Sequence, residues 1–86
     1  MIQLTLYSRT YCHLCDDMLA AVQALGKSHA FDIHVIDVDA DQALIARYDE
    51  LVPVLTGSRE GGPAVEICHY FLDETRLVLF LTSGST

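Results

Sequence analysis

Two cysteines three residues apart, Cys12 and Cys15, are the side chains of this chain best suited to chemistry. They lie between residues 2–7, which alternate between apolar and polar like a strand, and residues 14–25, which have helical spacing. Side chains at i and i+3 share one face of a helix, so the two thiols can close a reversible disulfide. Spacing and position together predict a dithiol redox site.

The start of the predicted helix assigns a different role to each thiol. Unpaired backbone N–H groups and the helix dipole favour an anion at a helix N-terminus, so Cys12 is predicted to be the nucleophilic thiolate. Cys15 is then the thiol that resolves a mixed disulfide. Two aspartates follow the pair and oppose ionisation of Cys12, but Arg9 and His13 can offset them. We therefore expect a modest net lowering of the pKa of Cys12.

Several residues near the pair have an alternative to a chemical role. His13 can be a solvated side chain of the first helical turn, or it can stabilise the thiolate when protonated. Tyr11 can be a plain loop aromatic, or it can shield the thiol that follows it.

A zinc site is a second interpretation of the cysteines, since Cys12, Cys15, Cys68 and His69 are all residue types that bind zinc. Neighbouring residues of a strand point to opposite faces, however, so Cys68 and His69 cannot easily meet at one ion. Cys68 is therefore predicted to be a small buried hydrophobic residue, and no metal site is predicted.

Charge and hydropathy restrict the partners of the chain. Twelve acidic side chains against five Lys and Arg give a net charge of −7, which disfavours nucleic acid and anionic membrane surfaces. No apolar run approaches the about 18 residues of a membrane span, and no secretory signal is recognisable. With three cysteines and no signal, a reducing cytoplasm is the expected compartment. We expect a soluble, cytoplasmic, monomeric domain that contacts neither nucleic acid nor membrane.

The hydropathy pattern predicts four strands and three helices in 86 residues. The strands are expected over residues 2–7, 31–38, 51–56 and 64–70, and the helices over 14–25, 39–48 with Asp39 as its cap, and from Asp73 onward. A turn is expected over 58–63, and residues 83–86 are expected to be a flexible tail after a domain of residues 1–82. The first two strands should be parallel and the last two antiparallel. The order β-α-β-α-β-β-α is that of the thioredoxin-like α/β fold, a four-stranded mixed sheet flanked by helices.

In its motifs the chain resembles the glutaredoxin-like branch of the thioredoxin superfamily. The matching segments are Tyr-Ser-Arg at 7–9, Cys-His-Leu-Cys-Asp at 12–16, Asp-Val-Asp-Ala-Asp at 37–41 and Val-Pro-Val-Leu at 52–55. The resemblance implies a cis peptide bond between Val52 and Pro53 that faces the cysteines, with the Val52 backbone presented to a thiol-bearing substrate. Arg9, Tyr11 and His13 complete the predicted substrate-binding residues.

The resemblance also implies an activity: a glutaredoxin-like thiol-disulfide oxidoreductase that serves electron transport and needs no cofactor. Its partners would be protein or small-molecule disulfides, glutathione among them. Glutaredoxins usually hold glutathione with a Gly-Gly and an acid, whereas this chain has His69, Tyr70 and Phe71 there. Arg9 remains as a contact for a carboxylate. We therefore expect weak activity with glutathione.

Two other classes of function stay open on the sequence. The same cysteines could bind a metal or an iron–sulfur cluster, which stoichiometric metal in the isolated protein would reveal. The domain could also be a redox-inert interaction module that keeps the fold. Loss of two thiols on mild oxidation would argue against that.

Overall fold

The structure, a computed structural model, describes residues 2–82 and confirms the predicted order of helices and strands. The elements are β1 (Ile2–Ser8), α1 (His13–Leu25), β2 (Asp32–Asp37), the 3-10 helix η1 (Val38–Ala40), α2 (Gln42–Tyr48), β3 (Val54–Arg59), β4 (Val65–His69) and α3 (Glu74–Thr82). The predicted tail, residues 83–86, lies outside the described residues.

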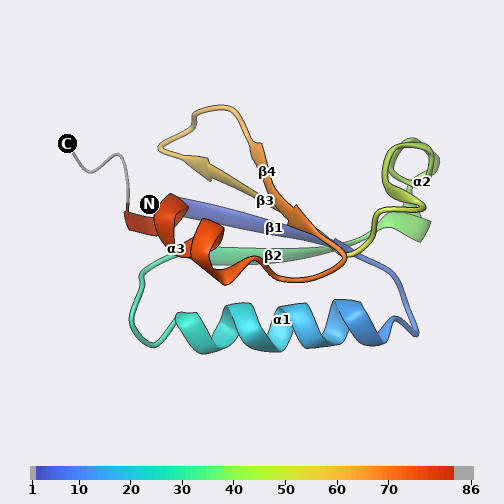
Figure 1. The fold of residues 1–86 in the computed structure, drawn as a ribbon. Helices are drawn as coiled ribbons and strands as arrows, with labels where there is room; N and C mark the ends of the chain where they lie inside the picture. Colours follow the sequence, from blue (N-terminus) through green and yellow to red (C-terminus); the bar gives the residue numbers. More distant parts are fainter. Residues whose placement is uncertain (1, 83–86) are drawn as a thin grey trace.

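The strands form one mixed sheet with the order β2-β1-β3-β4 (Figure 1). β1 runs parallel to β2 and antiparallel to β3, and β3 runs antiparallel to β4. A parallel pair needs a long crossover, which α1 supplies, whereas a short Gly-rich turn suffices between β3 and β4. The predicted four-stranded thioredoxin-like sheet is thus confirmed.

Two helices, α1 and α3, cover one face of the sheet. Leu6 of β1 and Leu55 of β3 are fully buried in a cluster that includes Met18 of α1 and Leu77 of α3. Val54, the neighbour of Leu55 on β3, points to the opposite face of the sheet. There it packs in a second buried cluster with Val38 of η1 and Tyr48 of α2. Figure 1 shows α1 along one side of the sheet and α2 beyond the end at which β1 stops.

None of the helices described between residues 2 and 82 is long and apolar enough to cross a membrane. The longest, α1, has 13 residues.

The third strand differs from its predicted range of 51–56. It begins at Val54 because the N–H groups of Leu51 and Val52 donate to the carbonyl of Tyr48, at 2.8 and 3.1 Å, and so continue the end of α2. At its other end the strand reaches Arg59, inside the predicted turn, because it pairs with β1 as far as Ile2. Pairing with a long neighbour thus overrides the local turn residues.

The predicted cap of the second helix is also wrong. Asp39 does not cap α2; Asp41 does, because its Oδ1 accepts from the Ala43 N–H at 2.8 Å. Asp37 caps η1 in the same way, since its Oδ1 accepts from the Asp39 N–H at 2.9 Å. Three aspartates at alternate positions offer three similar caps, and the 3-10 turn between strand and helix moves the start of α2 two residues onward.

A β-bulge in β4 changes which side chains reach the core. Leu55 pairs with Cys68 and Thr56 with Glu66, which leaves Ile67 as the extra residue. Ile67 and Cys68 are therefore both buried in the α1–α3 cluster. Glu66 and His69 share the outer face, where Oε2 and Nδ1 lie 3.0 Å apart. In a strand without a bulge, residues three apart would point to opposite faces.

Candidate functional site

The two predicted reactive residues lie together where β1 leads into α1. Cys12 is the N-cap of α1, with extended backbone angles of φ −115° and ψ 106°. Cys15 stands in the first turn, 5.2 Å away between Cα atoms, and the two sulfurs form a disulfide. Their Cα separation lies within the range of protein disulfides.

The surroundings of the two sulfurs differ. The Cys12 Sγ accepts a hydrogen bond from the Cys15 backbone N–H at 3.1 Å, as the side chain of a helix N-cap does. Cys12 is partly exposed, whereas Cys15 is 2% exposed. A thiolate at Cys12 would keep that N–H donor and the positive end of the helix dipole, and a substrate can reach it.

Tyr11 and His13 flank the accessible sulfur and are both exposed. The Tyr11 backbone has a φ of +59°, and its side chain is fully exposed at 101%. Its ring therefore does not lie over Cys12 in this structure. Contacts of either residue with a substrate remain a prediction.

Val52 and Pro53 lie at the same end of the sheet as the cysteines, because Val54, the first residue of β3, pairs with Tyr7 near the end of β1. The Val52-Pro53 peptide bond is cis, as the resemblance implied, and Pro53 is buried. The Val52 N–H already donates to the Tyr48 carbonyl at 3.1 Å. A substrate strand that pairs with Val52 would therefore have to use its carbonyl or displace that bond.

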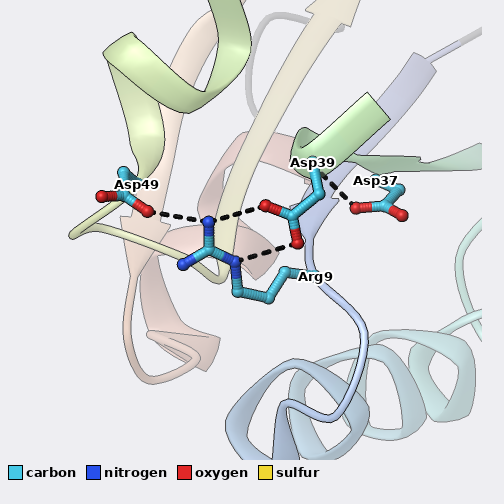
Figure 2. Close-up of polar contacts among 4 residues, drawn as sticks. All are labelled: Arg9, Asp37, Asp39 and Asp49. Atoms are coloured by element: carbon cyan, nitrogen blue, oxygen red, sulfur yellow. Dashed lines mark hydrogen bonds and ion pairs between the residues drawn. The ribbon is translucent and has the colours of Figure 1, made fainter. Parts of the chain in front are cut away.

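Arg9 makes contacts that the sequence did not reveal (Figure 2). Its Nη2 lies 2.8 Å from Oδ1 of Asp39 and 2.7 Å from Oδ1 of Asp49, and its Nε donates to Oδ2 of Asp39 at 3.3 Å. Hydrogen bonds to the two carboxylates raise the pKa of Arg9. We call these three residues the Arg9 clamp. The clamp joins the loop before Cys12 to η1 and to the C-terminal end of α2. The Arg9 side chain, which was predicted to bind a substrate carboxylate, is therefore already paired with two carboxylates of the protein.

Tyr70 is a second residue whose contacts were not predicted. It has a φ of +63°, its N–H donates to the Pro53 carbonyl at 2.9 Å, and its hydroxyl donates to the Glu50 carbonyl. Tyr70 thus holds both ends of the segment that contains the cis peptide bond. The next residue, Phe71, is 70% exposed. Two consecutive aromatic residues just after an edge strand were the available sequence signal.

A family model described as the Glutaredoxin-like domain (DUF836) matches residues 3–82. The chain belongs to this glutaredoxin-like family. The predicted resemblance is confirmed, and no curated protein matches the chain.

Three solved structures are similar to this glutaredoxin-like domain. Protein Ne2328 from Nitrosomonas europaea is 37% identical, with a TM-score of 0.82 over 94% of this chain and 92% of that one. Target protein XcR50 from X. campestris is 36% identical, with a TM-score of 0.62 over 91% and 93%. A mutant thioredoxin from Halobacterium salinarum is 26% identical, with a TM-score of 0.76 over 99% and 75%. The fold and the paired cysteines place the domain in the thioredoxin superfamily.

The third cysteine of the glutaredoxin-like domain is separate from the reactive pair. Cys68 is 7% exposed, as predicted, and burial raises the pKa of its thiol. The side chain of His69 is 40% exposed and points to the other face of β4. Within residues 2–82, no three His, Cys, Asp or Glu side chains are grouped so that they could hold a metal ion.

Proposed function

We propose that this glutaredoxin-like domain is a thiol-disulfide oxidoreductase in which Cys12 attacks and Cys15 resolves. The contrast between the two sulfurs carries the proposal. Cys12 is accessible and accepts a backbone N–H bond at a helix N-terminus, whereas Cys15 is buried behind it. A sulfur with a stabilised anion and an open approach is suited to attack, and a covered neighbour is suited to intramolecular release.

The reaction balances between the dithiol and one substrate disulfide. The Cys12 thiolate bonds to one substrate sulfur, the substrate S–S bond breaks, and the other sulfur leaves as a thiolate that takes up a proton. The Cys15 thiolate then attacks the Cys12 Sγ and releases the second substrate thiol. Two electrons pass to the substrate, and the protein ends as the Cys12–Cys15 disulfide.

The proposed substrates are protein or small-molecule disulfides. Disulfides that contain glutathione are proposed to be weak substrates. His69, Tyr70 and Phe71 occupy the place of the Gly-Gly and acid expected of a glutathione site. The Arg9 clamp supports the same proposal, because the guanidinium is already paired with two carboxylates. A glutathionylated substrate with a low-micromolar Michaelis constant would contradict it.

Trapping with bis(2-hydroxyethyl) disulfide tests the assignment of roles. We expect reduced Cys15→Ser to accumulate a mixed disulfide on Cys12, visible by mass spectrometry, since no thiol remains to resolve it. Cys12→Ser should capture little, because Cys15 is buried. Cys68→Ala, which changes a buried thiol outside the pair, is the control and should behave like the natural protein.

The opposite pattern, capture by Cys12→Ser and none by Cys15→Ser, would reverse the roles. If the natural protein reduces no disulfide at all, the domain is a redox-inert module and the proposed function is wrong.

A further inference from the structure

A groove of about 270 Å³ lies beside the cysteine pair, between α1 and the segment that joins β4 to α3. Leu14, Met18 and Ala21 of α1 line one side, and residues 70–72 line the other. Because Leu14 stands between the two cysteines in sequence, the groove begins at the reactive motif. We call it the α1 groove.

Packing within the single chain does not explain why three large apolar side chains that line the α1 groove are exposed to solvent. Phe71 is 70% exposed, Tyr70 is 40% exposed and Leu14 is 39% exposed. Large apolar residues that gather at the surface beside a reactive group mark a site of interaction. Tyr11, which precedes Cys12 in the sequence, is a further fully exposed aromatic side chain.

The charge and the size of the α1 groove restrict which kind of ligand can bind there. Asp17 lines it, Asp16 is its neighbour on α1, and none of the lining residues is basic. A cationic group is favoured there, and the carboxylates of glutathione are not. A volume of about 270 Å³ is below that of the usual small-molecule site, about 300–1,000 Å³, and suits one or two apolar side chains.

We propose that the α1 groove binds a large apolar side chain of an extended polypeptide substrate, close in sequence to the substrate disulfide and next to a Lys or Arg that meets Asp17. The proposal rests on the proposed function and narrows its substrates to protein disulfides in such a context. We favour a polypeptide as the occupant because the groove begins next to Cys12. A single segment of a polypeptide can present a disulfide to Cys12 and an apolar side chain to the groove at the same time.

Three short synthetic peptides, identical except after the second cysteine of their single internal disulfide, test the proposal. One carries Leu-Lys there, one Ser-Lys and one Leu-Glu. The pre-reduced protein is mixed with each peptide in single-turnover reactions, and with bis(2-hydroxyethyl) disulfide as a reference too small to fill the groove. We expect the Leu-Lys peptide to react about tenfold faster than Ser-Lys and about threefold faster than Leu-Glu at low salt.

Two substitutions locate that preference on the protein. In Phe71→Ser, the preference for Leu-Lys over Ser-Lys should fall below about threefold, because the anchor loses the larger wall of its pocket. Ala21→Glu fills the groove with a charged side chain and should have the same effect. Leu79→Ser removes a comparably exposed apolar side chain, 60% exposed on α3 and outside the groove, and should keep the full preference.

Equal rates with the Leu-Lys and Ser-Lys peptides would overturn the proposal while the proposed function stands. A preference that survives in Phe71→Ser and Ala21→Glu would do the same. If sedimentation shows a dimer that Phe71→Ser abolishes, a second copy of the chain occupies the groove, and the proposal is wrong. Failure to reduce even bis(2-hydroxyethyl) disulfide would instead reject the proposed function itself.

Discussion

Tyr11 is a residue that folding alone does not explain. It is fully exposed, and its φ of +59° lies in the left-handed region, which disfavours bulky side chains. Such backbone strain tends to collect at functional sites, where another advantage offsets its cost. A large ring beside Cys12 is consistent with contact to substrate.

The backbone at Tyr11 predicts an order of stability among variants. We expect Tyr11→Gly to be more stable than Tyr11→Ala by about 1 kcal/mol, because glycine adopts a positive φ without a steric penalty. Urea denaturation of the two oxidised proteins measures the difference. Both variants remove the same exposed ring, so each serves as the control for the other, and equal stabilities would contradict the left-handed conformation.

Cys68 gives the oxidised protein a pH dependence of stability. Burial raises the pKa of this thiol, so the folded state holds its proton more tightly than the unfolded state does. The resulting stabilisation is complete below the ordinary thiol pKa of about 8.5 and is lost as the pH rises toward the higher folded pKa. The free energy of unfolding should therefore fall above about pH 8.5, by at most about 1.4 kcal/mol per pH unit.

Urea denaturation between about pH 7 and 9 measures this slope, at pH values below the ordinary tyrosine pKa of about 10. The other two cysteines form the disulfide and contribute nothing in the oxidised protein. Cys68→Ala should lack the slope, although it lowers stability at every pH. Parallel curves for the two proteins would show that Cys68 is not the group responsible.

At the scale of the elements, the Arg9 clamp ties the loop before Cys12 to η1 and α2. Arg9→Lys keeps the charge but loses the planar fork that reaches two carboxylates. We expect it to slow single-turnover reduction by about three- to tenfold, less than the about 100-fold that a 1 Å misplacement can cost. Arg47→Lys, an exposed arginine of α2 outside the clamp, is the matched control.

Asp49→Asn should show a similar but smaller loss, since Asp39 still holds Arg9. If Arg9→Lys reacts as fast as the natural protein, the clamp does not position the reactive loop.

The close approach of β3 and α3 depends on Gly57. A Cβ placed there would lie 2.6 Å from Cε2 of Phe80 and 3.1 Å from Cδ1 of Ile67. The Phe80 ring is held under the Arg59 guanidinium, 4.5 Å from its centre, so it cannot simply move aside. We expect Gly57→Ala to destabilise the protein by about 1–3 kcal/mol, as overpacking does.

Thermal or urea denaturation checks this value, with Ser58→Ala as a control on the same strand. Adding Phe80→Leu to Gly57→Ala should recover part of the loss, because residues in contact are not additive. A strictly additive double variant would place the cause elsewhere.

The sequence predicted the elements well because each has a strong local pattern. Alternating Ile2, Leu4 and Leu6 mark β1, and the i, i+3 and i+4 spacing that includes Met18 and Val22 marks α1. The dithiol followed from its position between those two patterns. The parts that were missed depend on pairing between distant segments: the start of β3, the bulge in β4 and the cap at Asp41.

The site was predicted least well where it is built from several elements. Arg9 was recognised as a functional candidate, but its partners Asp39 and Asp49 lie 30 and 40 positions away. Tyr70 and Phe71 were recognised only as a departure from the glutathione pattern. The hydrogen bond of Tyr70 to Pro53 and the place of both residues opposite α1 in the groove arise from the return of the chain along β4, which no local periodicity indicates.

At the scale of the whole molecule, the net charge of −7 should select among small disulfides. We expect cystamine, a dication, to react about tenfold faster than the dianion 3,3′-dithiodipropionate at low ionic strength, because a negative field attracts cations. Each rate is divided by that with dithiothreitol to remove differences in intrinsic reactivity. Bis(2-hydroxyethyl) disulfide is the neutral control.

The preference should shrink in about 1 M salt, where the Debye length is about 3 Å. A dianion that reacts faster, or a preference that salt does not change, would show that the overall charge does not govern approach to Cys12.

The bulge in β4 acts on the strand as a change of parity. Before Ile67, the even-numbered residue Glu66 points outward; after it, the even-numbered residue Cys68 points inward and the odd-numbered His69 points outward. Replacement of Ile67 alters one contact, whereas its deletion would restore plain alternation, with Glu66 still outward and Cys68 still inward, and would remove one buried side chain. The extra residue therefore lets the strand bury two consecutive apolar side chains, Ile67 and Cys68, while the residues on either side keep the faces they would have in a regular strand.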